Sequence, residues 1–525
     1  MLKGLLRYYH TIKFLRWTQI KHQVLYKFIQ PEPNRNKLHN SKVAKAEGVN
    51  LKFQESIVAP CSYQENNTFK FLNITHKFSE NIDWNISKHG KLWVYNLNYF
   101  EYLSQSELTR TQGLELIDDF IRNEETIKDG MEPFPISLRT IFWIKFLLNH
   151  GIVHDHINAS LLWQLKILSA RPEYHLMGNH LLENGFSLLF GGCYLGNKEF
   201  VQQAKTILIE QLDEQILPDG AHFELSPMYH CLILYRILDS INLIQENPQL
   251  ELKELLDILQ DKAAKMLGWL QQMIFGNGSL PRVNDSVDGI SPNTKALFDY
   301  AQRLEISIRK LSLSESGYRK RVNNNFELLV DVGRIGPDYI PGHSHSDTLN
   351  FILHFHGKPM IVDTGVSTYE KNQKRNQERS TSAHNTVAIA GGEQSEVWGG
   401  FRVARRANVF NLEESTNLIS ASHDGYFRIH TFHQRSFSFE ENSITIIDKI
   451  SKKSDAKAYL HFHPDVEVSL VGNELQGASW RIVFEDTSKI QLLEYQYAEG
   501  FNKTRVAQKA VLSFKDTLCT KIIGE

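Results

Sequence analysis

The sequence predicts a multidomain α+β fold, with a helical domain in the earlier part of the chain and an antiparallel β-sandwich in the later part. The 525 residues exceed what one compact hydrophobic core usually holds, so more than one domain is expected. From about Trp93 to about Leu311, apolar residues recur at helical spacing. After about Asn325 they alternate in short runs with no helical segment between them, which is typical of antiparallel sheets packed face to face.

Each predicted helix or strand is a stretch in which apolar residues recur at one spacing, and turn residues bound it. Amphipathic segments separated by short Pro, Gly and Asn interruptions are typical of antiparallel helix pairs. The expected helices lie within residues 106–123, 137–151, 158–171, 180–196, 197–216, 229–245 and 252–274. Runs of β-branched and aromatic residues predict strands. The expected strands lie within residues 326–333, 349–363, 385–391, 436–450, 458–472, 480–486 and 490–498.

The first 48 residues are expected to form a basic amphipathic segment followed by a linker. Six Lys and Arg residues occur among Leu, Tyr, Phe and Trp before the first acidic residue, Glu32. A helix of this kind either packs against the body of the protein or lies on an anionic membrane surface as a peripheral contact. Residues 31–48 are polar and include two prolines, as linkers do. The helical domain is then expected at 49–320 and the β-sandwich at 321–525.

The composition and the N-terminal sequence restrict which kinds of partner and which location are expected. The net charge of −2 argues against a nucleic-acid-binding protein, which usually carries a strong basic excess. The four cysteines are far apart and form no CxxC pair, so neither a disulfide framework nor a thiolate zinc site is indicated. The N-terminus lacks the continuous apolar core and the cleavage site of a secretory signal. We therefore expect a cytoplasmic protein, peripheral to the inner face of the membrane if the basic segment binds lipid. Composition carries no prediction of the oligomeric state.

Two polar motifs open apolar helices in the helical half. In GNHLLENG, Asn179 starts the helix, and His180 and Glu183 lie on one face at i, i+3. The alternative is plain helix capping by Asn179 with His180 and Glu183 on the surface. In DGAHFELSPMYH, Tyr229 lies at a helix start, where the helix dipole favours the phenolate and thus proton transfer. The alternative is an amphipathic tyrosine at a domain surface.

Histidines and aspartates gather in the strand-rich half. His343 and His345 lie at i, i+2, so both side chains leave the same face of a strand. Asp363 follows His345 at a spacing that suits a hairpin return, and His384 lies further along the chain. Two imidazoles and a carboxylate suit zinc or a similar divalent ion. Because the flanking runs FILHFH and MIVDTG are typical of buried strands, surface histidines fit this pattern poorly.

The motifs NHLLENG, DGAHFELSPMYH, GHSHSDTLNF, IVDTG and RSTSAHNTV occur in an order that resembles the heparinase II/III family of polysaccharide lyases. The resemblance extends from about Trp93 to the C-terminus, and it rests on the order of five motifs rather than on any one of them. It implies an incomplete (α/α) toroid followed by an antiparallel β-sandwich. It also implies cleavage of an acidic, uronate-containing polysaccharide or oligosaccharide by β-elimination, which is the reaction of a carbon–oxygen lyase.

The same resemblance implies roles for particular residues. Asn179 would neutralise the substrate carboxylate, and Tyr229 and His343 would carry the proton transfers. The positions that match the family's metal ligands, with zinc as the expected ion, are His345, Asp363 and His384. A metal there would organise the site and would not attack the substrate. His180 and Glu183 match further active-site positions of the family. Three more candidate substrate contacts follow from their places in the sequence: Arg139, for which packing within the toroid is an equal alternative, and Tyr369 and Arg379 from the sandwich.

Three functions remain open at this point. A polysaccharide lyase and a uronyl C5-epimerase both remove the proton at C5, and they differ in whether O4 is then expelled. A catalytically silent glycan-binding protein is the third, because a fold alone does not determine an activity. The expected absence of a secretory signal favours a role in polysaccharide synthesis or turnover inside the cell, which raises the standing of the epimerase.

Overall fold

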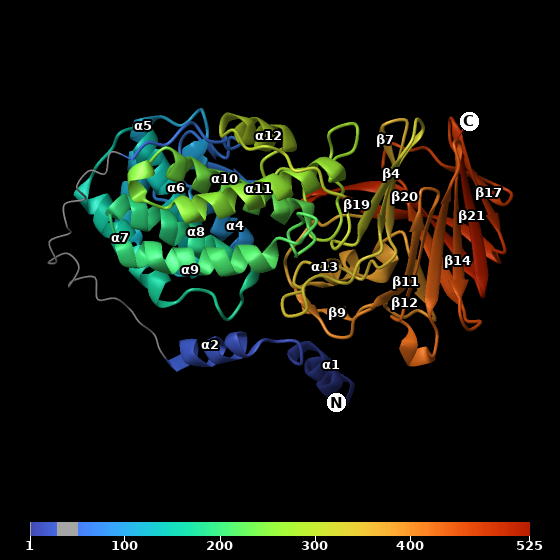
Figure 1. The fold of residues 1–525 in the computed structure, drawn as a ribbon. Coiled ribbons are helices and arrows are strands. Elements are labelled where there is room, and N and C mark those ends of the chain that lie inside the picture. Colours follow the sequence, from blue (N-terminus) through green and yellow to red (C-terminus); the bar gives the residue numbers. More distant parts are fainter. Residues whose placement is uncertain (1, 29–50, 525) are drawn as a thin grey trace.

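A computed structural model describes residues 2–28 and 51–524 of the chain. Its helices gather at one end of the molecule and its strands at the other, as Figure 1 shows. The predicted order of a helical domain followed by an antiparallel sheet domain is therefore confirmed. The expected linker at residues 31–48 lies outside the described residues. None of the described helices is long and apolar enough to cross a membrane.

The helical domain consists of helices that pack against their neighbours in the chain. Its members are α4 (Lys91–Tyr99), α5 (Arg110–Asn123), α6 (Pro133–Asn149), α7 (Asp155–Ala170), α8 (Gly178–Leu195), α9 (Lys198–Gln215), α10 (Pro227–Gln245), α11 (Lys253–Met273) and α12 (Thr294–Arg303). Helix α8 is buried along most of its length and contacts α6, α7, α9 and α10. All seven predicted helices are present, whereas α4 and α12 were not predicted.

The sheet domain has four antiparallel sheets among the described residues, the smallest of which pairs β9 (Val397–Trp398) with β10 (Arg402–Val403). Its strands are β4 (Tyr318–Val322), β5 (Phe326–Asp331), β6 (Phe351–Phe355), β7 (Lys358–Ile361), β8 (Val387–Ile389), β11 (Val409–Ser415), β12 (Leu418–His423), β13 (His433–Phe439), β14 (Ser443–Ile450), β15 (Ala456–His461), β16 (Ser469–Val471), β17 (Glu474–Gln476), β18 (Trp480–Glu485), β19 (Lys489–Gly500), β20 (Lys503–Phe514) and β21 (Thr517–Gly524). The large sheet has the order β11-β12-β13-β14-β21-β18-β17-β16. The smaller sheets have the orders β19-β20-β15-β8 and β4-β5-β6-β7, and a bridge between Ile361 and Phe462 connects them.

One hydrophobic core joins these sheets. It includes Phe351 from β6, Ile389 from β8 and Leu512 from β20 on the smaller sheets, and Phe437 and Ile522 from the large sheet. Along β13 and β21 every second residue is buried, which places one face of each strand against this core. The alternation read from the sequence therefore arises from the packing of one sheet on another.

Some features differ from the sequence-based expectation. The basic N-terminal segment forms two helices, α1 (Leu2–Ile12) and α2 (Trp17–Phe28), because the Gln19 side chain accepts a hydrogen bond from the Arg16 backbone and starts a new helix. A small sheet of strands β1 (Tyr63–Gln64), β2 (Thr68–Phe71) and β3 (Ile74–Lys77) lies in the chain between α2 and α4. The expected domain limit at residue 320 falls inside β4.

Candidate active site

Tyr229 and His343 meet where the helical domain contacts the sandwich. Tyr229 lies in the first turn of α10, and His343 lies on the loop between β5 and β6. Their rings stack with centroids 3.9 Å apart and an interplanar angle of 30°. The structure thus brings together the two residues that were expected to carry proton transfers, from positions 114 residues apart in the chain.

The start of α10 is anchored to the segment that precedes the sandwich. Ser226 is the N-cap of α10, and its hydroxyl accepts from the Tyr229 backbone N–H. The same hydroxyl donates to the carbonyl of Asp285 at 2.9 Å. The backbone N–H of Asp285 in turn donates to the carbonyl of His343 at 3.1 Å. These three hydrogen bonds therefore fix Tyr229 and His343 relative to one another.

The carboxylate of Asp285 holds both histidines of the GHSHSD motif. Its Oδ2 accepts from His343 Nδ1 at 2.8 Å, and its Oδ1 accepts from His345 Nε2 at 2.9 Å. Arg375, on the short helix α13 (Gln373–Glu378), donates to both oxygens at 2.5 and 2.6 Å. Burial alone would raise the pKa of Asp285, but Arg375 and the two histidines hold that pKa well below its usual range. Asp285 is therefore ionised and acts only as an acceptor.

This arrangement sets the tautomer of His343. Because an ionised Asp285 cannot donate, His343 Nδ1 carries a proton, and in the neutral imidazole Nε2 is then the nitrogen with the lone pair. His343 Nε2 lies 3.5 Å from Oε2 of Glu224. A histidine held in this way can accept a proton at Nε2, and the carboxylate behind it stabilises the resulting imidazolium.

Tyr229 is protonated in this structure. Burial raises the pKa of Tyr229 far above its ordinary value, with the carboxylates of Asp285 and Glu224 adding to the effect and Tyr369 and Arg375 opposing it. The helix dipole was expected to favour the phenolate, and that expectation is wrong because desolvation outweighs it. The Tyr229 hydroxyl lies 3.4 Å from that of Tyr369, which was an expected substrate contact. Tyr229 is thus suited to donate a proton rather than to accept one.

Asn179 begins α8 and faces Glu224. Its side-chain Nδ2 donates to Glu224 Oε2 at 2.9 Å, and its backbone N–H donates to Oε1 at 3.1 Å. Gly178 permits this approach, since it has a φ of +59° and a β-carbon there would lie 2.8 Å from Glu224 Oε1. One N–H of the Asn179 amide has a partner in Glu224, and the other has no hydrogen-bond partner among the described residues.

His180 and Glu183 have separate partners although they share one face of α8. His180 Nδ1 lies 3.1 Å from Oε1 of Glu173. Burial would lower the pKa of His180, but Glu173 raises it above its usual value. Glu183 Oε2 accepts from Arg236 Nε at 3.1 Å. The structure therefore places Glu183 in a buried ion pair, with its carboxyl also lining the cavity described below.

Two arginines expected to contact substrate are structural instead. Arg139 is fully buried in α6 and donates to the side chain of Gln164 and to the carbonyls of Asn98 and Gly130. Arg379 is also fully buried and donates to the carbonyls of Ser344 and Gly400. Since their polar groups are engaged by the protein and neither lines the cavity, both expectations are corrected. Arg379 supports the loop that carries His343.

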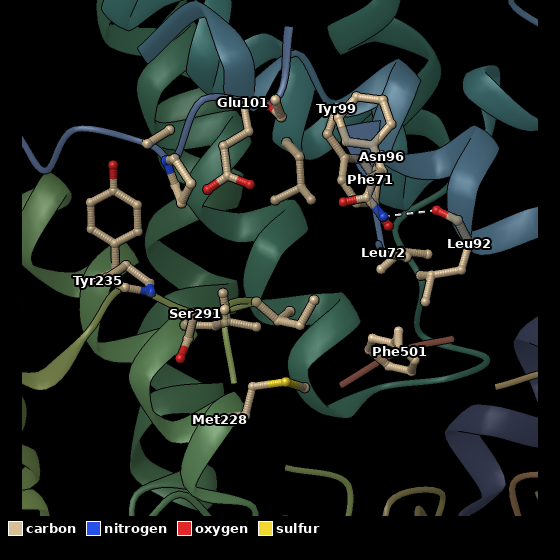
Figure 2. A pocket seen from close by; sticks show the side chains of 18 of the residues that line it. Phe71, Leu72, Leu92, Asn96, Tyr99, Glu101, Met228, Tyr235, Ser291 and Phe501 are labelled. Atoms are coloured by element: carbon tan, nitrogen blue, oxygen red, sulfur yellow. Dashed lines mark hydrogen bonds between the residues drawn. The ribbon is translucent and has the colours of Figure 1, made fainter. Parts of the chain in front are cut away.

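A cavity of about 410 Å³ opens beside Tyr229 and Tyr369. Figure 2 shows Asn96 and Tyr99 of α4, and Glu101 just after α4, on the side of the cavity opposite Met228 and Ser291. Asn96 donates to the carbonyl of Leu92. Pockets of several hundred Å³ accommodate small organic ligands, so the volume suits a short oligosaccharide segment.

The three expected metal ligands lie close together behind the His343 loop. His384 Nδ1 and Asp363 Oδ2 are 2.8 Å apart, and the rings of His345 and His384 are 5.3 Å apart. His345 Nδ1 and His384 Nε2 are buried without a hydrogen-bond partner, as is Asp347 Oδ2. Within residues 2–28 and 51–524, no group of three or more His, Cys, Asp and Glu side chains has the geometry of a ready metal site.

Sequence reasoning missed three residues of this site. Asp285 lies in the polar stretch VNDSVDG and Arg375 lies in KNQKRNQERS, and both stretches have the composition of solvated loops. Glu224 lies within a motif that was singled out, yet nothing in the local sequence distinguishes it from a surface carboxylate. Only the fold brings these residues to His343 and Asn179.

Comparisons with known proteins find similarity over most of the chain. Residues 159–305 match the heparinase II/III N-terminus and residues 308–524 match the heparinase II/III-like C-terminal domain. Heparin-sulfate lyases from Bacteroides stercoris and Pedobacter heparinus are each 22% identical over 403 residues, covering 70% and 71% of this chain. The chain spans 56% and 58% of the length of these two relatives.

Solved structures of similar fold support the predicted architecture. A crystal structure of heparinase III has a TM-score of 0.71 at 16% identity, covering 96% of this chain and 88% of that one. A mutant heparan sulfate lyase from Pedobacter heparinus has a TM-score of 0.59 at 15% identity, covering 93% and 87%. The predicted fold class, an incomplete (α/α) toroid followed by an antiparallel β-sandwich, is confirmed.

We expect Asp285→Asn to lower turnover by about 100-fold or more, because an amide no longer fixes the Nδ1–H tautomer of His343. Nitrogen-15 NMR of the His343 ring would report the tautomer directly, and a merely structural role would leave that signal unchanged in the folded variant. The variant should also melt at a lower temperature, since it leaves the buried charge of Arg375 without a counter-charge. Asp257→Asn, on the exposed face of α11, is the matched control. Full turnover in Asp285→Asn would show that this carboxylate does not position the base.

Proposed function

The chain belongs to the heparinase II/III family, and on that premise we propose that it cleaves an acidic, uronate-containing polysaccharide by β-elimination. The observation that carries the proposal is the stacked pair of Tyr229 and His343 beside the cavity, with the Asp285 carboxylate behind His343. The names of the two relatives, both heparin-sulfate lyases, support the same class of substrate. The reaction is that of a carbon–oxygen lyase acting on polysaccharides.

The first step is removal of the C5 proton of the uronate. His343 Nε2 accepts this proton, and the negative charge of Asp285 stabilises the imidazolium that forms. The carboxylate next to C5 takes up negative charge as the C–H bond breaks. The free N–H of Asn179 is the donor placed to stabilise that charge, and a well-placed donor of this kind lowers the barrier by roughly 3 kcal/mol.

The second step breaks the bond between C4 and O4. The electron pair left at C5 forms the C4=C5 double bond, and O4 leaves with the proton of the Tyr229 hydroxyl. The high pKa of Tyr229 keeps that proton in place until the leaving oxygen needs it. Transfer of a proton from the imidazolium of His343 to the phenolate of Tyr229, directly or through water, then restores both groups, which their stacking keeps adjacent.

A divalent metal, with zinc as the preferred ion, completes the proposal. The residues that would hold it are His345, Asp363 and His384. Support comes from the buried, unpartnered ring nitrogens Nδ1 of His345 and Nε2 of His384, and from the closeness of Asp363, which is hydrogen-bonded to His384 Nδ1 at 2.8 Å. A bound ion would supply a fixed charge that holds the loop carrying His343 in place.

The catalytic pair can be tested by substitution. Tyr229→Phe and His343→Ala should each reduce turnover by about 100-fold or more, the usual loss for a general acid or base. The double variant should be little worse than the poorer single variant, because the two residues act on one proton path. The measurement is the ultraviolet absorbance of the 4,5-unsaturated uronate released from a panel of uronate polysaccharides.

Tyr459→Phe in β15 is the matched control and should retain wild-type turnover. If Tyr229→Phe is as active as the wild type, the assignment of the acid is wrong. Incorporation of solvent deuterium at C5 without any unsaturated product would identify an epimerase, and neither signal would leave a glycan-binding protein.

The metal has its own test. Protein purified without chelators should contain about one zinc ion per chain, and His345→Ala should lower both the metal content and the melting temperature. Elemental analysis and thermal unfolding with and without chelator measure these effects. His430→Ala, on an exposed turn, is the matched control. Wild-type protein that contains no divalent metal would contradict the proposal.

A further inference from the structure

The two N-terminal helices turn an apolar stripe toward solvent. In α1, Leu5, Tyr9 and Ile12 follow one another at i, i+4 and i+7, and all three are exposed. A helix that belongs only to a protein surface normally turns such a stripe toward the core. The outward direction of this stripe therefore calls for an explanation.

The second helix continues the pattern. Trp17, Lys21, Val24 and Phe28 lie on one face of α2 at i, i+4, i+7 and i+11. Trp17 is 74% exposed and Phe28 is 84% exposed, although large aromatic side chains are usually well buried. Exposed apolar residues that gather on one face, rather than singly, mark an interaction surface.

Contacts on the opposite face of α2 hold this orientation. The buried Gln19 side chain donates to the carbonyl of Leu176 at 3.1 Å, and the Tyr26 hydroxyl donates to the carbonyl of Pro172 at 2.6 Å. These contacts attach α2 to the helical domain. The exposed stripe cannot rotate inward without breaking them.

Helix α1 is attached to the sandwich in the same way. Arg7 pairs with Glu396 at 2.8 Å, and the ring of Tyr8 contacts that of Trp398 edge-on at 5.0 Å. The Trp398 indole also donates to the Thr11 hydroxyl. The helix pair therefore lies across both domains along one side of the molecule, as Figure 1 shows.

The charge of the segment identifies the partner. Residues 1–31 contain six Lys and Arg and no Asp or Glu, whereas the whole chain has a net charge of −2. Lys21 and Lys27 are exposed in α2, and Lys13 is exposed in the turn between the two helices. Aromatic and aliphatic residues beside exposed lysines are the composition of helices that lie in the interface of an anionic bilayer.

We propose that α1 and α2 form a docking surface for an anionic phospholipid membrane, with the stripe of Leu5, Tyr9, Ile12, Trp17 and Phe28 inserted at the level of the headgroups. The anionic leaflet of a cell membrane is the cytoplasmic one, so the proposal includes that location. Two other occupants fit less well. A second copy joined through the same face would bring two basic segments together, and an acidic glycan offers no apolar surface to the aliphatic side chains.

Flotation of the full chain with lipid vesicles tests the proposal. The protein should float with vesicles of phosphatidylcholine containing phosphatidylglycerol, and at least tenfold less with phosphatidylcholine alone. A triple variant, Leu5→Ser with Trp17→Ser and Phe28→Ser, should reduce the bound fraction by about tenfold or more. The control triple variant, Val322→Ser with Phe427→Ser and Val506→Ser, removes equally exposed apolar residues of the sandwich and should bind like the wild type.

The electrostatic part has a separate test. Lys21→Gln with Lys27→Gln should weaken binding by at least about tenfold at physiological salt, and Lys452→Gln with Lys453→Gln should not. Thermal unfolding checks that every variant folds. Equal binding by the triple variant and the wild type overturns the proposal. The proposal is also overturned if the wild type does not bind vesicles but forms a concentration-dependent dimer, seen by light scattering, that the triple variant does not form.

Discussion

The buried carboxylate of Asp285 is the interaction on which the rest of the site depends. It is fully buried, and an ion in such a place is tolerated only when its charge and its lone pairs are satisfied. Arg375 supplies the opposite charge, and His343 and His345 supply two further donors. Asp285 and its partners come from three separate segments, so the requirement to satisfy one carboxylate determines how the end of the helical domain, the β5–β6 loop and α13 come together. The geometry of His343 follows from that constraint.

Two neighbouring groups are driven to opposite protonation states by their surroundings. Asp285 stays ionised because Arg375 and the histidines outweigh its burial, whereas Tyr229 stays protonated because burial dominates. When environments push the pKa values of paired groups apart, the acid and base roles follow. In the proposed mechanism, Nε2 of His343 is therefore the base and the phenol of Tyr229 is the acid. Packing, rather than the identity of the residues alone, assigns these roles.

The sequence predicted those features that depend on local periodicity. Seven helices and the alternating strands were found because each buries one face and repeats its apolar residues accordingly. The motifs also located Asn179, Tyr229 and His343, which the fold brings to one site, and the resemblance supplied their roles. The metal ligands remain a prediction.

The failures have physical causes that local sequence does not carry. Asp285 and Arg375 lie in polar stretches, and they form an ion pair although they are 90 residues apart in the chain. Arg139 was a candidate for the lining of the cleft, and Arg379 was a candidate substrate contact because it comes just before the AHN motif. In the fold the N–H donors of both are used by backbone carbonyls and a side-chain amide. Similarly, one basic segment became two helices because a single side chain, Gln19, caps the backbone between them.

The N-terminal segment contacts the loop that carries His343, so the proposed membrane-binding surface and the site are physically connected. The guanidinium of Arg16 lies over the ring of Tyr339 at 4.0 Å, and Gln19 donates to the Tyr339 carbonyl at 3.4 Å. Tyr339 precedes His343 by four residues on the same loop, and its hydroxyl donates to Glu214 of the helical domain. Displacement of α2 from the helical domain would therefore also disturb the loop that carries His343. Conversely, any partner that binds α1 and α2 without displacing them would stabilise the domain arrangement in which Tyr229 and His343 are stacked.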